Sequence, residues 1–131
     1  MLLPEYLELT HLRNNNMEKS QVYAKHKTAR ISAKKVAPVM DLIRGKGLIE
    51  AKVTLAFDRT KAAVLLLKLL RSAEANATNN RKLDSSKLFV SEVWVGPGPT
   101  YKRMRLVAKS RVSPIMKRTS NIYVGLSERN K

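Results

Sequence analysis

The stretch from Gly96 to Ser120, GPGPTYKRMRLVAKSRVSPIMKRTS, constrains the fold of this chain more than any other. It holds seven cations and no anion. The cations are Lys102, Arg103, Arg105, Lys109, Arg111, Lys117 and Arg118. Apolar residues such as Met104, Leu106 and Ile115 lie between them, which a solvated tail would not normally carry. Because burying unpaired charge is costly, we expect this segment to stand off the body and to be surrounded by anions.

The spacing of these residues predicts a projecting β-hairpin. In an extended chain the Lys102 side chain points away from those of Arg103 and Arg105, so cations emerge from both faces. If residues 88–125 form one hairpin, each arm spans roughly 50 Å, whereas a domain of this size has a radius of gyration of about 13–14 Å. The tip must therefore project. No Asn-Gly or Asp-Gly pair marks a tight turn, so we expect a wider loop around Leu106–Arg111.

The charge of the whole chain indicates a polyanionic partner. Twenty-six Lys and Arg oppose ten Asp and Glu among 131 residues, which gives a net charge of +16. Apolar residues make up 44%, enough for one domain with its own core. Nucleic acid is the first expectation for a partner and an anionic membrane surface is the second. The strongly apolar run 62–70 contains Lys68 and is far too short to span a bilayer.

The N-terminal stretch MLLPEYLELTHLRNNN, residues 1–16, differs from the rest because it contains two acids and one base apart from its histidine. It has no basic n-region, so it is not expected to be a signal peptide. We interpret it as an extension that forms a tail or a short helix. The sequence leaves open whether translation starts at Met17. Residues 17–131 are then predicted to form a single domain that binds nucleic acid.

Three helices are predicted in the first half of this domain. After a weak strand signal in residues 20–30, Ser32 can cap a helix that ends at Gly45, and Pro38 should kink that helix or shift its start. A second helix is predicted over Leu48–Phe57. Its expected inner face consists of Ile49, Val53, Ala56 and Phe57.

The third helix is the clearest element, and two strands follow it. Thr60 is a good N-cap, and KAAVLLLKLLRSAEANA then continues without Gly or Pro. LFVSEVWV, at residues 88–95, is apolar on both faces and is predicted to be a central strand, whereas NIYVGLS is a second strand. We expect Phe57, Phe89 and Trp94 in the core rather than on a stacking surface.

Residues for catalysis or metal binding are scarce. The chain has no Cys, and its two histidines, His11 and His26, have no carboxylate cluster beside them in the sequence. The acids are scattered singly, and the serines near the hairpin have no partnered base. Gly45-Lys46-Gly47 lacks phosphate-loop spacing. We therefore expect no enzyme activity, no cofactor, no metal and no small-molecule substrate.

Three stretches together resemble one known family, that of bacterial large-subunit ribosomal protein twenty-two. ARISAKKVAPVMDLIRGK resembles its first helix, KAAVLLLKLLRSAEANATNN its long helix, and GPTYKRMRLVAKSRVSPIMKRTSNIYVGLSER its hairpin. The match covers about residues 20–129. It implies an α+β fold, with three helices packed on a small antiparallel sheet and a long projecting β-hairpin. The implied function is a structural one in the large ribosomal subunit, in RNA binding and subunit assembly, with the hairpin tip at the peptide exit tunnel.

The predicted site residues combine two basic clusters with this resemblance. The RNA-binding residues are Lys25, His26, Lys27, Arg30, Lys34, Lys35, Arg44, Lys102, Arg103, Arg105, Lys109, Arg111, Lys117 and Arg118. The tunnel tip is Leu106, Val107, Ala108, Lys109, Ser110 and Arg111. Familiar members are often richer in Arg and Gly at the tip, where this chain has Val107 and Ser110. The implied partners are large-subunit ribosomal RNA, neighbouring ribosomal proteins and the nascent peptide, in a cytoplasmic ribosome or, alternatively, an organellar one.

Other classes of protein fit the sequence less well. A general nucleic-acid chaperone or DNA-binding protein would use the same charge without a fixed site. Such a protein would bind duplex DNA and unrelated RNA with similar affinity, which distinguishes it from a ribosomal protein. A membrane-surface protein would need an amphipathic helix with a cationic face. The third helix has only Lys61, Lys68 and Arg71 along most of its length, so no membrane partner is expected.

Overall fold

The computed structural model describes residues 20–129, so the extension at residues 1–16 and the alternative start at Met17 lie outside it. The helical body comprises α2 (Ala33–Asp41), α3 (Leu48–Phe57) and α4 (Lys61–Ala75), continued by the π-helical turn η1 (Asn76–Asn80). The short 3-10 turn η2 (Ser85–Lys87) follows. The strands are β1 (Val22–Ala29), β2 (Leu88–Pro97), β3 (Tyr101–Leu106), β4 (Val112–Lys117) and β5 (Ser120–Glu128), with the 3-10 turn η3 (Ala108–Ser110) between β3 and β4.

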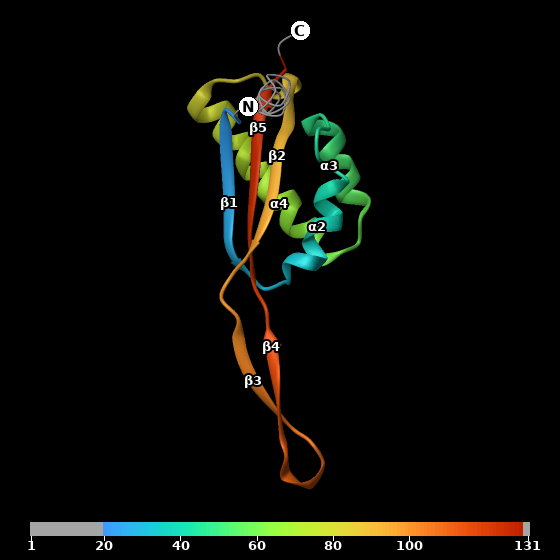
Figure 1. Cartoon of the computed structure of the whole chain (residues 1–131). Coiled ribbons are helices and arrows are strands. Elements are labelled where there is room, and N and C mark those ends of the chain that lie inside the picture. Colours follow the sequence, from blue (N-terminus) through green and yellow to red (C-terminus); the bar gives the residue numbers. More distant parts are fainter. Residues whose placement is uncertain (1–19, 130–131) are drawn as a thin grey trace, which may run out of the picture.

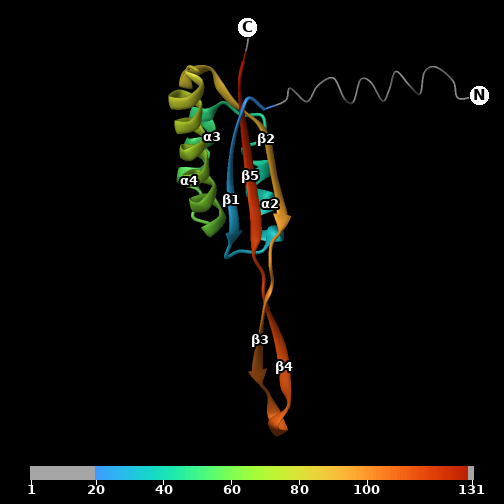
Figure 2. The same ribbon diagram turned by 90° about the vertical axis from the view of Figure 1, so that its left-hand side faces the viewer.

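The strands form two antiparallel sheets. The body sheet has the order β1-β5-β2, and β3 pairs only with β4. Helices pack against one face of the body sheet, no element of the described chain covers the other face, and the β3-β4 ribbon projects from one end (Figures 1 and 2). The predicted α+β fold with a projecting hairpin is therefore confirmed. The prediction that residues 88–95 form a central strand is wrong, because β5 lies between β1 and β2.

The hydrophobic core lies between the helices and the inner face of the body sheet. Leu66 and Leu70 of α4 are fully buried there, as are Ile122 and Val124 of β5. The start of α4 is as predicted, since the Thr60 hydroxyl accepts a hydrogen bond from a backbone N–H one turn along the helix. This helix is the main support of the sheet.

The helix α2 begins where Ser32 predicts, although the Ser32 side chain makes no capping hydrogen bond. Pro38 lies inside α2 and does not shift its start. The chain turns at Gly45, whose φ of 76° lies in the left-handed region that glycine adopts most easily. Its N–H donates to the Val90 carbonyl at 3.0 Å, which ties the end of this segment to β2.

The inner face predicted for α3 is wrong. Leu48, Ala51 and Leu55 are buried, whereas Ile49 and Val53 are more than half exposed. Phe57, at 84% exposed, and Ala56 also face solvent. Apolar residues occupy two neighbouring 3–4 stripes of the helix, so its pattern alone could not select the stripe that faces α4 and the sheet.

Trp94 also departs from the expected core position, with half of its surface exposed, and Phe89 is only partly buried. A β-bulge between Val90 and Glu92 shifts the alternation of β2. As a result Val90 and Val93 are buried, and Trp94 lies on the uncovered face of the sheet.

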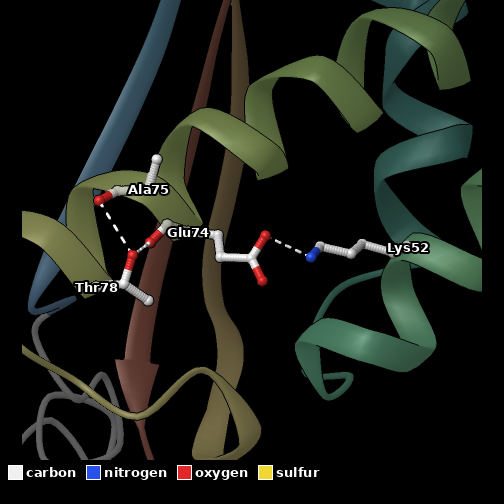
Figure 3. Close-up of polar contacts among 4 residues, drawn as sticks. All are labelled: Lys52, Glu74, Ala75 and Thr78. Atoms are coloured by element: carbon white, nitrogen blue, oxygen red, sulfur yellow. Dashed lines mark hydrogen bonds and ion pairs between the residues drawn. The ribbon is translucent and has the colours of Figure 1, made fainter.

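Helices α3 and α4 are linked by a partly buried ion pair between Lys52 and Glu74 (Figure 3). One turn further on, the Thr78 hydroxyl donates to the carbonyls of Glu74 at 3.1 Å and Ala75 at 3.3 Å. These bonds lie where α4 passes into the π-helical turn η1, and they provide partners for carbonyls at the end of the regular helix.

Candidate nucleic-acid interface

The β3-β4 ribbon is almost wholly exposed. Its register pairs Tyr101 with Lys117 at the base and Leu106 with Val112 near the tip. Every residue from 101 to 118 is exposed except Ile115, which is partly buried. A two-stranded ribbon without a covered face is marginal in water, so a surrounding partner would supply support that the body does not.

The tip of the ribbon is a loop of the predicted width. The Val107 N–H donates to the Arg111 carbonyl at 2.9 Å and closes the loop. Within it, Lys109 and Ser110 have φ values of 57° and 56°, in the left-handed region that non-glycine residues seldom adopt. The two side chains are exposed at the far end of the molecule.

Two hydrogen bonds join the two arms at the base of the ribbon, where they leave the body sheet. The Gly98 N–H donates to the Thr119 carbonyl at 3.0 Å, and the Thr119 hydroxyl donates to the Pro99 carbonyl at 2.6 Å. A Cβ atom at Gly98 would lie 2.5 Å from the Thr119 hydroxyl oxygen, so the close approach requires glycine here. The two arms therefore leave the body at a defined position.

A cationic pocket opens where the ribbon joins the body. Its volume is roughly 620 Å³, and no acid lines it. The cations that line it are Arg30, Lys35, Lys61, Lys117 and Arg118. These residues come from the end of β1, α2, α4 and the returning arm, so four separate parts of the chain converge on one site. In the described residues none of the five makes an ion pair, and an anion would relieve their mutual repulsion.

Tyr101 links this pocket to the ribbon. The Arg30 guanidinium lies 5.1 Å from the centre of the Tyr101 ring, and that of Arg103 lies 5.9 Å from it. Both distances fit cation–π contacts. Tyr101 therefore contacts two guanidinium groups at the base of the ribbon and is not part of the core.

The remaining predicted RNA-binding residues lie apart from the pocket. Lys25 is on the uncovered face of the sheet, Lys27 is exposed at the irregular end of β1, and Lys34 is exposed on the first turn of α2. His26, opposite Ile122 in the register, is exposed as well. Arg44 is bound within the body: it pairs with Asp41 at 3.2 Å and donates to the Val93 carbonyl at 3.2 Å.

Lys61 is the pocket residue that the sequence prediction missed. Its ammonium donates to the Arg30 carbonyl at 2.9 Å, so it links the start of α4 to the end of β1. Nothing in the local pattern distinguishes Lys61 from the exposed Lys68 on the same helix. Only the packing of α4 against the sheet places Lys61 beside the ribbon.

The described residues offer neither a metal site nor a membrane-spanning helix. Across residues 20–129, no three His, Cys, Asp or Glu side chains lie close enough together to hold a metal ion. No helix in that range has the length and apolar character needed to cross a membrane.

Comparison with known proteins identifies the family. Residues 24–127 match the family model for ribosomal protein L22p/L17e. The large ribosomal subunit protein uL22 of Lactobacillus delbrueckii subsp. bulgaricus is 48% identical over 111 residues, which is 85% of this chain and 95% of the relative. The uL22 of Pediococcus pentosaceus is 50% identical over 105 residues, 80% of this chain and 89% of the relative. That of Ligilactobacillus salivarius is 52% identical over 101 residues, 77% and 88% of the two chains. This chain therefore belongs to the ribosomal protein L22p/L17e family.

Proposed function

We propose that this chain is a structural constituent of the large ribosomal subunit and that it binds large-subunit ribosomal RNA through the ribbon and the cationic pocket. The observation that carries the proposal is the exposed ribbon itself, in which seven cations and no acid lie between residues 96 and 120. The relatives are named as proteins of the large subunit. The proposed role is architectural and not catalytic, and neighbouring ribosomal proteins are the expected further partners.

The proposed mechanism is neutralisation of phosphates from several directions. Cations on both faces of the ribbon would each displace condensed counterions from RNA, which gives affinity that falls as salt rises. The pocket would hold backbone phosphates at the foot of the ribbon. Since the arms leave the body at a fixed position, the spacing between pocket and tip would select RNA by its shape rather than by its base edges.

The tip is proposed to line the peptide exit tunnel. The residues that would face the tunnel are Leu106, Val107, Ala108, Lys109, Ser110 and Arg111. They are exposed and lie farthest from the body, which is the placement that such a role requires. Lys109 and Arg111 would bring positive charge to the tunnel wall, and Leu106 and Val107 an apolar surface for the nascent peptide.

The test is a competition binding assay at about 0.2 M salt, where non-specific phosphate affinity is already reduced. The protein is bound to labelled large-subunit ribosomal RNA. Unlabelled ribosomal RNA, unrelated structured RNA and duplex DNA are then added as separate competitors. The proposal expects ribosomal RNA to compete far better than the other two. Equal competition by all three would instead support a general nucleic-acid chaperone.

A pair of charge-matched variants locates the contact. Lys117→Ala with Arg118→Ala removes two pocket cations, whereas Lys68→Ala with Arg71→Ala removes two exposed cations from α4. Each phosphate contact contributes about 0.7–0.9 to the slope of log affinity against log salt. The pocket variant is expected to lower that slope by about 1.4–1.8, and the α4 variant by much less. An equal decrease of the slope in the two variants would show that RNA affinity depends only on the net charge of the protein.

A further inference from the structure

The uncovered face of the body sheet carries aromatic side chains on all three strands. Strand alternation places Tyr23 of β1, Tyr123 of β5 and Trp94 of β2 on this face, away from the helices. Trp94 lies opposite Tyr123 in the register, and Tyr23 lies opposite Gly125. Trp94 is 50% exposed and Tyr23 is 48% exposed.

Two of these rings form a stacked pair across neighbouring strands. The rings of Trp94 and Tyr123 are stacked, with centroids 3.7 Å apart and planes 9° from parallel. Gly125 lies opposite Tyr23, and an added Cβ there would meet the Ser20 side chain at 2.2 Å and the Tyr23 ring at 3.2 Å. The Tyr23 hydroxyl then reaches across to β2 and donates to the Glu92 carboxylate at 3.1 Å.

A purely structural role explains only part of this arrangement. A cross-strand aromatic pair stabilises a sheet by about 0.2–1 kcal/mol, which accounts for Trp94 contacting Tyr123. It does not account for the half of the indole that remains in solvent. Exposed aromatic surface on a continuous face is typical of a binding site.

The charges around the rings favour RNA over protein as the occupant. Lys25 lies opposite Tyr123 on this face, and the exposed Lys27 lies two residues further along β1, where the register shifts. Glu92 is the only carboxylate that the described strands place on this face, and it already accepts the Tyr23 hydrogen bond. Lysines are depleted at protein–protein interfaces, whereas phosphates beside a stacked base require cations.

We infer that this sheet face binds an unpaired base of ribosomal RNA, stacked on the exposed indole of Trp94, with neighbouring backbone phosphates at Lys25 and Lys27. The inference rests on the proposed function and adds a second contact on the body, distinct from the ribbon and the pocket. Aromatic stacking is how proteins commonly hold splayed-out RNA bases.

The experiment uses the fluorescence of Trp94, the only tryptophan of the chain. The full chain is titrated with large-subunit ribosomal RNA, and binding is followed separately by retention of labelled RNA on a filter. Stacking is expected to quench Trp94 emission and to protect it from acrylamide. Trp94→Ala is expected to weaken RNA binding about 5- to 150-fold, the usual range for loss of one stacked base. Trp94→Phe should retain most of the affinity, and Val64→Ala, an exposed apolar change on α4, should have none of these effects.

The outcomes separate this inference from the proposed function. If RNA binds on the filter but Trp94 emission and acrylamide access stay unchanged, the stacking site is refuted and the ribbon contact stands. The same holds if Trp94 becomes protected only when other ribosomal proteins are added, because this sheet face is then a protein interface. If ribosomal RNA does not bind at all, both proposals fail. The fluorescence titration needs no variant, so an unfolded Trp94→Ala protein would not prevent a decision.

Discussion

Replacing Tyr101–Lys117 with a four-residue Gly-Ser linker should leave the body folded. The 17 residues removed are exposed apart from Ile115, so little buried apolar surface is lost. Tyr101 and Lys117 are paired, so their neighbours stay about 5 Å apart and a short linker can join them. The bonds between Thr119 and the backbone of Gly98 and Pro99 are retained.

The size of the effect follows from chain entropy. Shortening a connection from 17 residues to four lowers the entropic free-energy cost of closing the loop. The decrease is (3/2)RT times the natural logarithm of the ratio of the two lengths, or about 1.3 kcal/mol at most. For a body of this size, that corresponds to a rise of up to roughly 5–10 °C in Tm. The ribbon in the intact protein is already partly ordered by its own pairing, which reduces the gain in stability. The expected change in Tm therefore lies between zero and that upper limit.

Thermal unfolding followed by circular dichroism measures this directly. A fall in Tm of more than about 5 °C, or loss of a cooperative transition, would refute the reasoning that the ribbon contributes nothing to the core. The same variant should lose affinity for ribosomal RNA, because six cations are removed with residues 101–117 and Arg118, at the base, is displaced. Retained affinity in a folded variant would contradict the proposed interface.

Two further predictions concern the body alone. Leu66→Ala, at a fully buried position in α4, should lower the free energy of unfolding by about 2–5 kcal/mol in urea titrations, whereas the exposed Val64→Ala should change it by less than about 0.5 kcal/mol. The pKa of Asp84 is held below its usual value, first by the hydrogen bond from the Ser86 N–H and then by that from the Ser86 hydroxyl. Its contribution to stability is therefore present above the usual aspartate pKa and lost as pH falls through the lowered one; in an NMR titration, Ser86→Ala should move the Asp84 pKa part of the way back up.

The sequence predicts best those elements whose local signals agree with one another. Thr60, an uninterrupted apolar stripe and the absence of Gly and Pro all indicate the same helix, and α4 begins where they predict. The projecting ribbon is predicted for a similar reason. Charges on both faces exclude packing against the body, and that conclusion depends on no distant contact.

Predictions failed where the answer depends on another part of the chain. The helix α3 has two neighbouring apolar stripes, so only contact with α4 decides that Leu55 is buried and Phe57 is exposed. The bulge in β2 turns Trp94 to the open face, and no residue type marks that bulge in advance. Likewise, Lys61 enters the pocket only because α4 crosses the sheet at the end of β1. Such tertiary placements cannot be obtained from local periodicity.

The strand order has a consequence for biogenesis. Because β5 lies between β1 and β2, neither of the outer strands has its ladder partner until the last described strand has been synthesised. The helices can form earlier from local contacts. The sheet cannot form until β5 is present, because β1 pairs with residues nearly 100 positions later in the chain, and such pairing has a high contact order. We therefore expect the nascent chain to expose its apolar helix faces until synthesis of β5 ends, and to need rapid sheet closure or a chaperone to avoid aggregation.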